Sequence, residues 1–488
     1  MLTPSAAAPT QITEFFTVSG FTHEQFKQNP TLRDLPSGRL GNLTDLTERT
    51  SEPTALNVLL RWFFLGLPLG SEAFAGLVPA PVVAQLVETG MLAREGERFI
   101  PKVMLTPCDG FLFAADPART LESPEATAMV LWPNPSTRLL QMFTIRRPAA
   151  TVLDLGAGCG ILAILASGHS RQVVASDLNP RATEFARFNV WLNGVNNVEC
   201  VTGDTFEPVA GRTFDLIASN PPFFVTPSAD QIYCENSMEL DGYCRELIRA
   251  APGYLNEGGF LQITLEWVQV KGQDWRDRLA EWLEATGCDA WVLRSYKRSA
   301  AAYAAERIGR MMPYSPLTEN QRFDEWMSYY GARGVEEVQG GIMALRKRSG
   351  NNWIRIEEVA SLDCTEPFGE AVVELFANQD RLETERSVEQ MMAWKPRLPA
   401  DAWVDQQLRL EAGEWKPSSM QLRRPGGLPA SLALDPQVAG FLRGCDGTRT
   451  LDELSRKLAA EVGVDAEQVR QQCCAVVRKL VDRRLALL

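Results

Sequence analysis

The sequence predicts an α/β protein built around a seven-stranded, mainly parallel sheet, with a smaller domain on each side. From about residue 148, short β-rich runs alternate with amphipathic helical segments, which is the pattern of strands joined by crossover helices. The first run ends in a glycine-rich turn that opens directly into a helical segment. Helical periodicity before and after this central region indicates the flanking domains.

The N-terminal region, residues 1–120, is predicted to be a helical or winged-helix domain. Apolar side chains recur there at helical spacing, for example at Leu56, Leu59, Leu60 and Phe63. Turn residues at 94–96 lie between two strand-like runs and predict a β-hairpin within 91–105, as in the wing of a winged helix. A plain helical cap on the next domain is equally compatible with this pattern.

The central domain is predicted to cover residues 121–349. Its seven strands are expected at 151–155, 172–176, 197–201, 214–219, 260–265, 290–293 and 341–345, where runs of β-branched and other apolar residues fit buried or half-buried strands. Amphipathic segments around 182–189 and 244–255 are expected to be two of the crossover helices.

Two further segments follow the central domain. Residues 350–430 are rich in tryptophan, proline and charge but poorly periodic, so we expect a connector packed on the core. Residues 431–488 regain helical periodicity and are expected to form a small helical or winged-helix-like domain. Thr450 and Glu453 have the spacing of a capping box, and Asp465 precedes the last apolar-periodic run as an N-cap.

Composition narrows the possible partners and compartments. The 488 residues carry a formal net charge of -12, which opposes general attraction to nucleic-acid phosphates but leaves a local basic face possible. The ten cysteines lack the paired spacings of a zinc site, so we expect no metal and reduced thiols in the cytoplasm. The N-terminus lacks a basic segment followed by an apolar core, and Arg61 interrupts the most apolar run, so we expect neither secretion nor a membrane span.

The glycine-rich turn after the first strand is typical of a nucleotide-cofactor site. Gly156, Gly158 and Gly160 allow positive φ angles and close approach of a ligand, and the following helix offers free N–H groups. Asp154 immediately precedes them. Its negative charge would repel a pyrophosphate but suits the cationic amino-acid end of S-adenosylmethionine. The alternative is a tight structural turn.

Carboxylates at the ends of the next two strands fit the rest of such a cofactor. Asp177 lies about twenty residues beyond the glycines, as expected of a residue that accepts both ribose hydroxyls, although it could also cap the next helix. Asp204 follows the third strand, where it can accept the adenine amino group. Phe206 is nearby as a candidate ring contact. A surface turn is the alternative for these last two residues.

The fourth strand ends in Asn220, Pro221, Pro222 and Phe223, the candidate catalytic residues. The two prolines cannot donate to a strand ladder, so backbone carbonyls are left free. A substrate NH₂ group can donate one hydrogen to the Asn220 side-chain oxygen and the other to the Pro221 carbonyl, and Phe223 can stack on a planar amide or base. The attacking nitrogen loses its proton after transfer, so chemistry here needs no histidine base, and the chain has only two histidines.

On these motifs, residues from about 130 to 270 resemble class I methyltransferases of the "small domain" group. The group includes release-factor glutamine N5-methyltransferases and ribosomal RNA guanine N2 and adenine N6 enzymes. The resemblance implies a Rossmann-like core that binds S-adenosylmethionine through Asp154, Gly156, Gly158, Gly160, Asp177 and Asp204, with the target nitrogen held at residues 220–223. The proline-rich segment 133–140 is similar to one in the glutamine enzymes. It departs from them at Ser136 and Arg138, where acidic residues are usual, and at Phe223, where tyrosine is usual.

The C-terminal segment from Leu434 to Leu488 resembles winged-helix peptide-binding domains such as the peptide chaperone of pyrroloquinoline quinone biosynthesis. A helical dimerisation or packing module is equally compatible with its 55 or so residues. We therefore expect an N-methyltransferase acting on a planar NH₂ nitrogen, with protein glutamine as first choice and an RNA or DNA base as the alternative. A third possibility is a cofactor-binding interaction protein without turnover. In the first two cases residues 1–120 would recognise the substrate.

Overall fold

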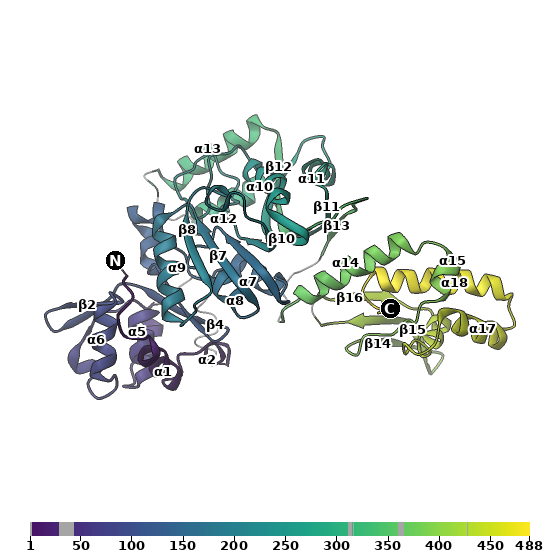
Figure 1. Cartoon of the computed structure of the whole chain (residues 1–488), viewed down its shortest axis with the longest axis horizontal. Coiled ribbons are helices and arrows are strands. Elements are labelled where there is room, and N and C mark those ends of the chain that lie inside the picture. Colours follow the sequence, from purple (N-terminus) through teal and green to yellow (C-terminus); the bar gives the residue numbers. More distant parts are fainter. Residues whose placement is uncertain (1, 29–42, 311–314, 316, 360–365, 427) are drawn as a thin grey trace. The chain divides into compact units, whose positions relative to one another are not determined.

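The structure, a computed structural model, describes residues 2–28, 43–310, 315, 317–359, 366–426 and 428–488. The chain forms two compact units (Figure 1). The first consists of Met1–Gln141 and Arg147–Ser361, and the second of Met142–Arg146 and Leu362–Leu488. Among the described residues, no helix combines the length and the apolar character needed to cross a membrane.

The first unit begins with short helices and a three-stranded sheet of order β1-β3-β2. The elements are α1 (Thr10–Val18), α2 (His23–Gln28), α4 (Leu43–Arg49), α5 (Ala55–Phe63), β1 (Leu69–Gly70), η2 (Ser71–Ala73), α6 (Ala80–Glu88), β2 (Leu92–Glu95) and β3 (Arg98–Pro101). Thr54 caps α5 by accepting the Asn57 N–H, and α5 buries five apolar side chains. The β2–β3 hairpin confirms the hairpin expected within 91–105, with Gly96 at a positive φ in its turn. Whether the whole region is a winged helix stays a prediction.

The central sheet has eight strands in the order β13-β11-β12-β10-β9-β6-β7-β8. They are β6 (Ala149–Leu155), β7 (Ser170–Asp177), β8 (Val198–Thr202), β9 (Phe214–Ser219), β10 (Leu255–Val270), β11 (Cys288–Ser299), β12 (Val335–Lys347) and β13 (Ile354–Glu358). Strands β6 to β10 run parallel, whereas β12 lies antiparallel between β10 and β11. The seven predicted strands are confirmed. The eighth, β13, pairs with β11 in the segment predicted as connector, because its five half-exposed residues belong to a sheet edge and show no apolar run.

Helices cover this sheet and close its core. They are α7 (Pro135–Phe143), α8 (Ile161–Ser167), α9 (Pro180–Leu192), α10 (Gly242–Ala250), η6 (Ala251–Tyr254), α11 (Trp275–Leu283), α12 (Ala300–Arg310) and α13 (Glu319–Ala332), with the short turns η3 (Ala118–Glu122), η4 (Pro124–Ala128) and η5 (Glu207–Val209). Helices α12 and α13 form the connection from β11 to β12 and pack on each other (Figure 1). One apolar cluster joins these two helices to Phe224 and Val225, which follow β9.

A second hairpin, β4 (Met104–Cys108) with β5 (Phe111–Ala115), connects the N-terminal elements to the sheet domain. Asn189 of α9 is fully buried and fixes this connection. Its side-chain oxygen accepts the Ala114 N–H at 2.8 Å, and its amide donates to the Ala114 carbonyl at 2.9 Å and to the Cys159 carbonyl at 2.8 Å. One buried amide therefore ties the hairpin to the glycine-rich turn.

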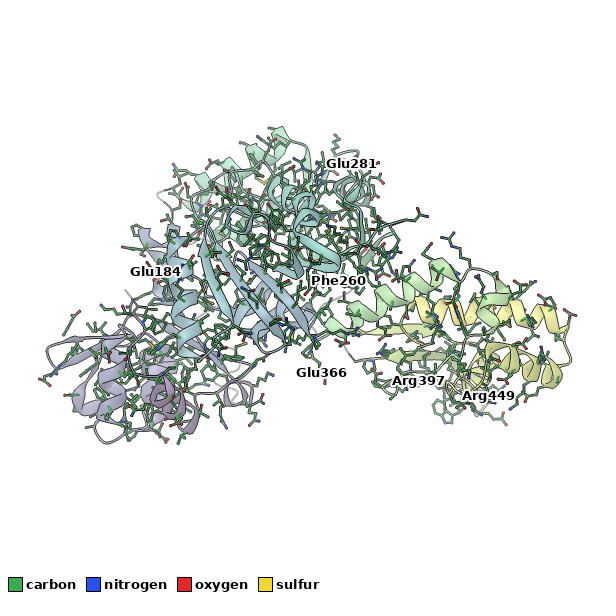
Figure 2. All side chains as sticks on the ribbon, in the orientation of Figure 1. Glu184, Phe260, Glu281, Glu366, Arg397 and Arg449 are labelled. Atoms are coloured by element: carbon green, nitrogen blue, oxygen red, sulfur yellow. The ribbon has the colours of Figure 1, made fainter. Side chains whose placement is uncertain are left out.

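The second unit has its own apolar core. It contains α14 (Gly369–Thr384), α15 (Val388–Met392), β14 (Trp403–Glu411), β15 (Glu414–Arg424), β16 (Ala430–Ala433), α16 (Pro436–Leu442), α17 (Leu451–Val462) and α18 (Ala466–Asp482). The predicted caps are confirmed: Thr450 and Glu453 form the capping box of α17, and Asp465 caps α18. Arg397, labelled in Figure 2, bridges by its backbone to Asp446 and Leu487.

This unit corrects the expected connector at residues 350–430. Trp394 is 2% exposed and shares a core with the C-terminal helices, for example with Leu451 and Leu480. Residues 369–424 therefore belong to the same folded unit as 431–488. The sequence did not predict this because the segment contributes single buried apolar residues and an exposed hairpin, and neither produces a periodic pattern of apolar residues.

Candidate functional site

The glycine-rich turn leads from β6 into α8 with the predicted geometry. Gly156, Gly158 and Gly160 have φ angles of 75°, 54° and 81°. The N–H groups of Gly156 and Ala157 both donate to the Ser176 carbonyl on the neighbouring strand, at 2.8 and 3.0 Å. A side chain at any of the three glycines would be strained, because L-residues rarely adopt positive φ. The turn is thus held rigidly at the carboxyl edge of the parallel strands.

Gly160 differs from the other two glycines because it does not line the cavity described below. A Cβ atom there would lie 3.1 Å from the Cβ of Ala186 on α9. Gly160 therefore allows α8 to pack closely against α9. Its contact with a cofactor stays a prediction.

Substituting Gly160 with alanine is expected to reduce the free energy of unfolding by about 1–3 kcal/mol, since the new side chain combines a positive φ with a clash. Urea unfolding of both proteins measures this difference. The matched control is Gly194→Ala, where φ is 63° but nothing lies within 4 Å of the new Cβ, so only the backbone strain remains. Equal losses for the two variants would contradict the packing role.

Asp154 lies in the wall of the cavity and is 1% exposed. One carboxylate oxygen, Oδ2, accepts the Ala163 N–H of α8 at 2.9 Å. The other, Oδ1, is buried and has no hydrogen-bond partner in the described part of the chain. Burial raises the pKa of Asp154 to about 7, opposed by the Ala163 hydrogen bond and assisted by the charge of Asp177. A buried carboxylate oxygen without a donor is costly, so this site fits a cationic donor group.

Asp177 ends β7 and holds the turn from the opposite side. Its Oδ2 accepts the Gly158 N–H and its Oδ1 accepts the Asn179 N–H, both at 2.8 Å. Burial raises its pKa, and these two hydrogen bonds oppose the shift. Each oxygen keeps a second lone pair and can accept a further donor. The alternative that Asp177 caps α9 is wrong, because the N-cap is Asn179, whose side chain accepts the Arg181 N–H.

One cavity of about 400 Å³ collects most of the predicted residues. The predicted residues that line it are Asp154, Gly156, Gly158, Asp177, Asp204, Asn220, Pro221 and Pro222. Asp204 is exposed at its rim and accepts a hydrogen bond from the Thr205 hydroxyl at 2.7 Å. The ends of adjacent parallel strands meet at one edge, which is why residues as far apart in the chain as Asp154 and Pro222 share this cavity.

Two predicted aromatic contacts are not at the cavity. Phe206 is 4% exposed and stacks on Tyr254, with ring centroids 4.3 Å apart, so it belongs to the apolar core under the sheet. Phe223 packs between two apolar clusters and does not line the cavity. Burial in a core stabilises the Phe206 ring more than exposure at a cavity wall would, whereas Phe223 is only partly buried.

The lining includes residues that no motif had indicated. Tyr233, Glu235 and Asn236 come from the loop after β9, and Tyr243 from the start of α10. Burial raises the pKa of Tyr243 to about 12, so it stays a neutral phenol at physiological pH. In the sequence, Tyr233 and Tyr243 differ from core residues only in that they follow the Asn-Pro-Pro-Phe segment closely. That position was not enough to predict that they line the cavity.

The side chain of Asn220 is oriented by two threonines. The Thr264 hydroxyl on β10 donates to Asn220 Oδ1 at 2.5 Å, and Asn220 Nδ2 donates to the Thr137 hydroxyl oxygen at 3.2 Å. Thr137 in turn donates to Asn134 Oδ1 at 3.0 Å. These bonds settle which end of the amide is oxygen, and Oδ1 keeps a second lone pair toward the cavity. Asn236 Nδ2 also donates to the Pro222 carbonyl at 2.7 Å, which fixes the following residue of the loop.

A buried polar network anchors the far end of this loop. The Val225 N–H donates to the Tyr303 hydroxyl oxygen at 3.2 Å, and the Tyr330 hydroxyl donates to the Val225 carbonyl at 2.6 Å. Tyr303 and Arg307 both donate to Glu266, which is fully buried. The pKa of Tyr303 is raised well above its usual value, first by burial and then by the charge of Glu266. Helices α12 and α13 therefore hold the segment after the prolines in one place.

Neither histidine is placed to act in the cavity. His23 Nδ1 accepts the Asp109 N–H at 2.7 Å, and neither His23 nor His169 lines the cavity. Potential ligand atoms of His23, Cys108 and Asp109 lie within 4.8 Å of one another. Gln141 donates to Asp109 Oδ2 and accepts from the Cys108 thiol, and none of the three residues lines the cavity.

Residues 134–281 match the family model "Methyltransferase small domain", and residues 373–487 match a "Domain of unknown function" model. The chain is 34% identical over 154 residues to a release factor glutamine methyltransferase of Geobacter sulfurreducens, covering 28% of this chain and 54% of the relative. It is also 34% identical over 119 residues to a putative protein N5-glutamine methyltransferase of Methanocaldococcus jannaschii (23% and 59%). A ribosomal RNA small subunit methyltransferase C of Cronobacter sakazakii is 39% identical over 114 residues (23% and 30%).

The chain thus spans little more than half the length of the curated glutamine methyltransferases that it matches. Solved structures with detectable similarity include a methyltransferase from Pyrococcus furiosus, at 18% identity and a TM-score of 0.26, covering 43% of this chain and 80% of that one. A tRNA m1G37 methyltransferase of M. jannaschii has 15% identity and a TM-score of 0.30, covering 51% and 58%.

Proposed function

We propose that this protein methylates the side-chain amide of a protein glutamine. Residues 134–281 belong to the methyltransferase small-domain family of class I, S-adenosylmethionine-dependent enzymes, and the glutamine methyltransferases are among the relatives of this region. The observation that carries the proposal is the placement of Asn220. Its amide is fixed by Thr137 and Thr264 and lines the same cavity as Asp154 and Asp177. Such a cavity can hold a cofactor and an acceptor nitrogen side by side.

The residues of the cavity fit the cofactor group by group. Asp154 offers its unpartnered Oδ1 to the α-amino group, and Asp177 offers two carboxylate lone pairs to the ribose hydroxyls. Asp204, at the rim, is proposed to accept the adenine amino group. S-adenosylmethionine, when bound, supplies an electrophilic methyl group.

Asn220 is proposed to position the acceptor. Its Oδ1 accepts one N–H of the target amide while the Pro221 carbonyl accepts the other, so the nitrogen presents its remaining face to the methyl group. Pro222 and the segment after it are held by Asn236 and by the Tyr303–Tyr330 pair. No side chain needs to remove a proton first, because the methylated nitrogen releases its proton to solvent afterwards.

The charges of the cavity favour a protein acceptor over a nucleic acid. Among the described residues that line it, the charged side chains are Asp154, Asp177, Asp204 and Glu235, all of them acidic. A nucleic-acid substrate carries phosphates next to its target base and needs cationic contacts at that point. A glutamine amide in a peptide needs none. The similarity to a ribosomal RNA enzyme keeps guanine N2 or adenine N6 as the second candidate.

Incubating the purified chain with S-adenosylmethionine labelled in the methyl group, together with a ribosome-free extract and separately with total RNA, tests the acceptor. We expect protease-sensitive label that is recovered as N5-methylglutamine after complete digestion. Asn220→Ala is the control for activity from contaminating enzymes. Label found only in ribonuclease-sensitive material would overturn the glutamine assignment, and no label above the Asn220→Ala control would favour a protein without turnover.

Thr264 is expected to matter only through Asn220. Thr264→Val removes the donor to Asn220 Oδ1 and is expected to lower kcat about tenfold, with S-adenosylmethionine affinity unchanged. Steady-state kinetics and calorimetry together measure this split. Thr264→Ser keeps the hydroxyl and should restore most of the activity. A variant in which kcat and cofactor affinity fall together would instead show that Thr264 supports the whole cavity.

The raised pKa of Asp154 predicts pH-dependent cofactor affinity. A cation binds the ionised carboxylate, so a free protein with a pKa of about 7 must release a proton when it binds below that pH. Between pH 6.5 and 5.5 we expect the Kd for S-adenosylmethionine to rise by up to about tenfold per pH unit. Calorimetry in buffers of different ionisation enthalpy measures the proton. Asp177 also has a raised pKa, so Asp154→Asn is the comparison, and an unchanged slope in it would assign the effect elsewhere.

The proposal also covers the domains on either side of residues 121–349 and the location of the protein in the cell. We propose that residues 1–120 and the C-terminal unit present the substrate to residues 121–349, and that the winged-helix-like character of residues 431–488 serves peptide binding. A cytoplasmic location is supported by the described cysteines, all nine of which are free.

A further inference from the structure

In the part of the chain that the structure describes, β14 of the C-terminal unit is paired on one side only, by β15. The sheet has the order β14-β15-β16, so β14 is an edge strand, and all nine of its residues are exposed. Ala412 and Gly413 connect the two strands with φ angles of 51° and 86°, which give a tight two-residue turn. A bulge opposite Gln407 and Leu408 has its extra residue, Ser418, on β15, so the alternation of side chains along β14 is not interrupted.

One face of this hairpin is apolar and uncovered. Val404, Leu408 and Leu410 lie on one face of β14 together with the polar Gln406, and Trp415 lies opposite Leu410. They share a face with Leu422, which lies opposite Val404 and is 1% exposed in the core of the unit. The exposed fractions of Val404, Leu408, Leu410 and Trp415 are 45%, 51%, 56% and 67%. An apolar face beside an unpaired edge is a surface that proteins normally cover.

We propose that β14 pairs with the β14 of a second copy of this chain, antiparallel and centred on Gln407. Gln407 is the middle residue of the nine-residue strand, so this register overlaps the two strands from end to end. It places Val404 opposite Leu410 and Asp405 opposite Arg409, each twice because of the two-fold symmetry. The remaining pairs are Gln406 with Leu408 and Trp403 with Glu411. The same register therefore forms an apolar pair, Val404 with Leu410, on one face and an opposite-charge pair, Asp405 with Arg409, on the other.

Neighbouring registers lose the pair of opposite charges between Asp405 and Arg409. Successive side chains of a strand alternate between the two faces of the sheet, so we compare only registers in which the apolar residues of both copies lie on the same face. Centring the pair on Leu408 would set Asp405 opposite Glu411, which places like charges together. Centring it on Gln406 would pair Val404 with Leu408, but it would leave Asp405 opposite the uncharged Gln407 and shorten the overlap. Self-complementarity in one register is the property that an interface between identical copies requires, and it favours a second copy over an unrelated strand.

The pairing would join three strands from each copy into one continuous sheet and satisfy the free backbone groups of both edges. The apolar residues of both hairpins would then lie side by side on one face. Asp405 already forms an ion pair with Arg423 of β15 at 2.6 Å, so Arg409 of the other copy adds a second cation to that carboxylate. The interface is independent of the proposed methyl transfer.

Cysteine cross-linking in the full chain tests the register. In the proposed pair the two Gln407 Cα atoms lie about 4.5–5.5 Å apart, within the range of a disulfide. We expect Gln407→Cys to form a covalent dimer on mild oxidation. Trp403→Cys is the matched control, because the two copies of that residue lie about 26 Å apart along the strands. Equal cross-linking of both variants, or none above the background of the wild-type thiols, overturns the register.

Charge variants test the pairing without a covalent bond. Arg409→Asp and Asp405→Arg each place like charges opposite one another, so each alone is expected to raise the dimer Kd at least about tenfold in sedimentation velocity. An equimolar mixture of the two restores both opposite-charge pairs and should form a heterodimer. Thermal unfolding checks that each variant is folded. A wild-type protein that stays monomeric at about 100 μM overturns the proposal, as does a mixture that is no more associated than its components. An intrachain cross-link from Gln407→Cys would show instead that the edge of β14 pairs with another part of the same chain.

Discussion

Replacing Asn220 with alanine is expected to reduce kcat by about 10²–10³-fold while the Kd for S-adenosylmethionine changes by less than about twofold. The substitution removes the oxygen that the acceptor N–H would meet. It leaves Asp154 and Asp177 with all the hydrogen bonds that the structure gives them. Steady-state methyl transfer and calorimetry on the same preparations measure the two quantities.

A matched control for this variant is Asn196→Ala, which makes the same chemical change at an exposed position outside the cavity. It should leave both quantities unchanged. Asn220→Asp adds a second comparison, because it keeps an acceptor oxygen but loses the amide that donates to Thr137. If Asn220→Ala kept its wild-type kcat, the acceptor would have to be held by other residues of the cavity.

Replacing Asp177 with alanine is expected to raise the Kd for S-adenosylmethionine by at least about 100-fold. Three losses combine: the ribose acceptor disappears, and the N–H groups of Gly158 and Asn179 lose the carboxylate to which they donate. Each buried group left without a partner costs about 1–3 kcal/mol, part of which appears as disorder of the turn. Isothermal titration calorimetry measures the change in affinity directly.

Asp204→Ala provides the contrast to Asp177. Asp204 is exposed, and the Thr205 hydroxyl donates to it at the rim of the cavity, so we expect only a several-fold weaker affinity. Thermal unfolding of both variants separates loss of binding from loss of fold. A wild-type protein that does not bind S-adenosylmethionine, or an Asp177→Ala protein that binds it as tightly as wild type, would remove the basis of the cofactor assignment.

Local sequence predicted the parts of the site that depend on backbone geometry. The positive φ angles of the glycine turn and the break at Pro221 and Pro222 follow from what those residues allow, wherever the rest of the chain lies. The seven strands could be found because each is a short apolar run bounded by turns. The caps of α17 and α18 are equally local.

Side-chain direction at the same positions required the fold. Phe206 and Phe223 lie in the expected segments, yet Phe206 is buried in the core and Phe223 packs against two apolar clusters. The partners of Asn220 come from residues 83 and 44 positions away in the chain. Neither distance leaves a periodic trace in the sequence, because a threonine that orients an amide has the same local pattern as any other threonine in a strand or helix.

The sequence by itself therefore determined the fold class, the positions of seven strands along the chain and the glycine-rich turn, since these depend on periodicity and on the conformations open to glycine and proline. Only the tertiary structure decided which side chains face the cavity, that β13 completes the sheet, and that residues 369–424 fold with the C-terminal helices. Those outcomes depend on contacts between distant segments. Their energy comes from burying apolar surface and pairing buried polar groups, which is determined only once the segments meet.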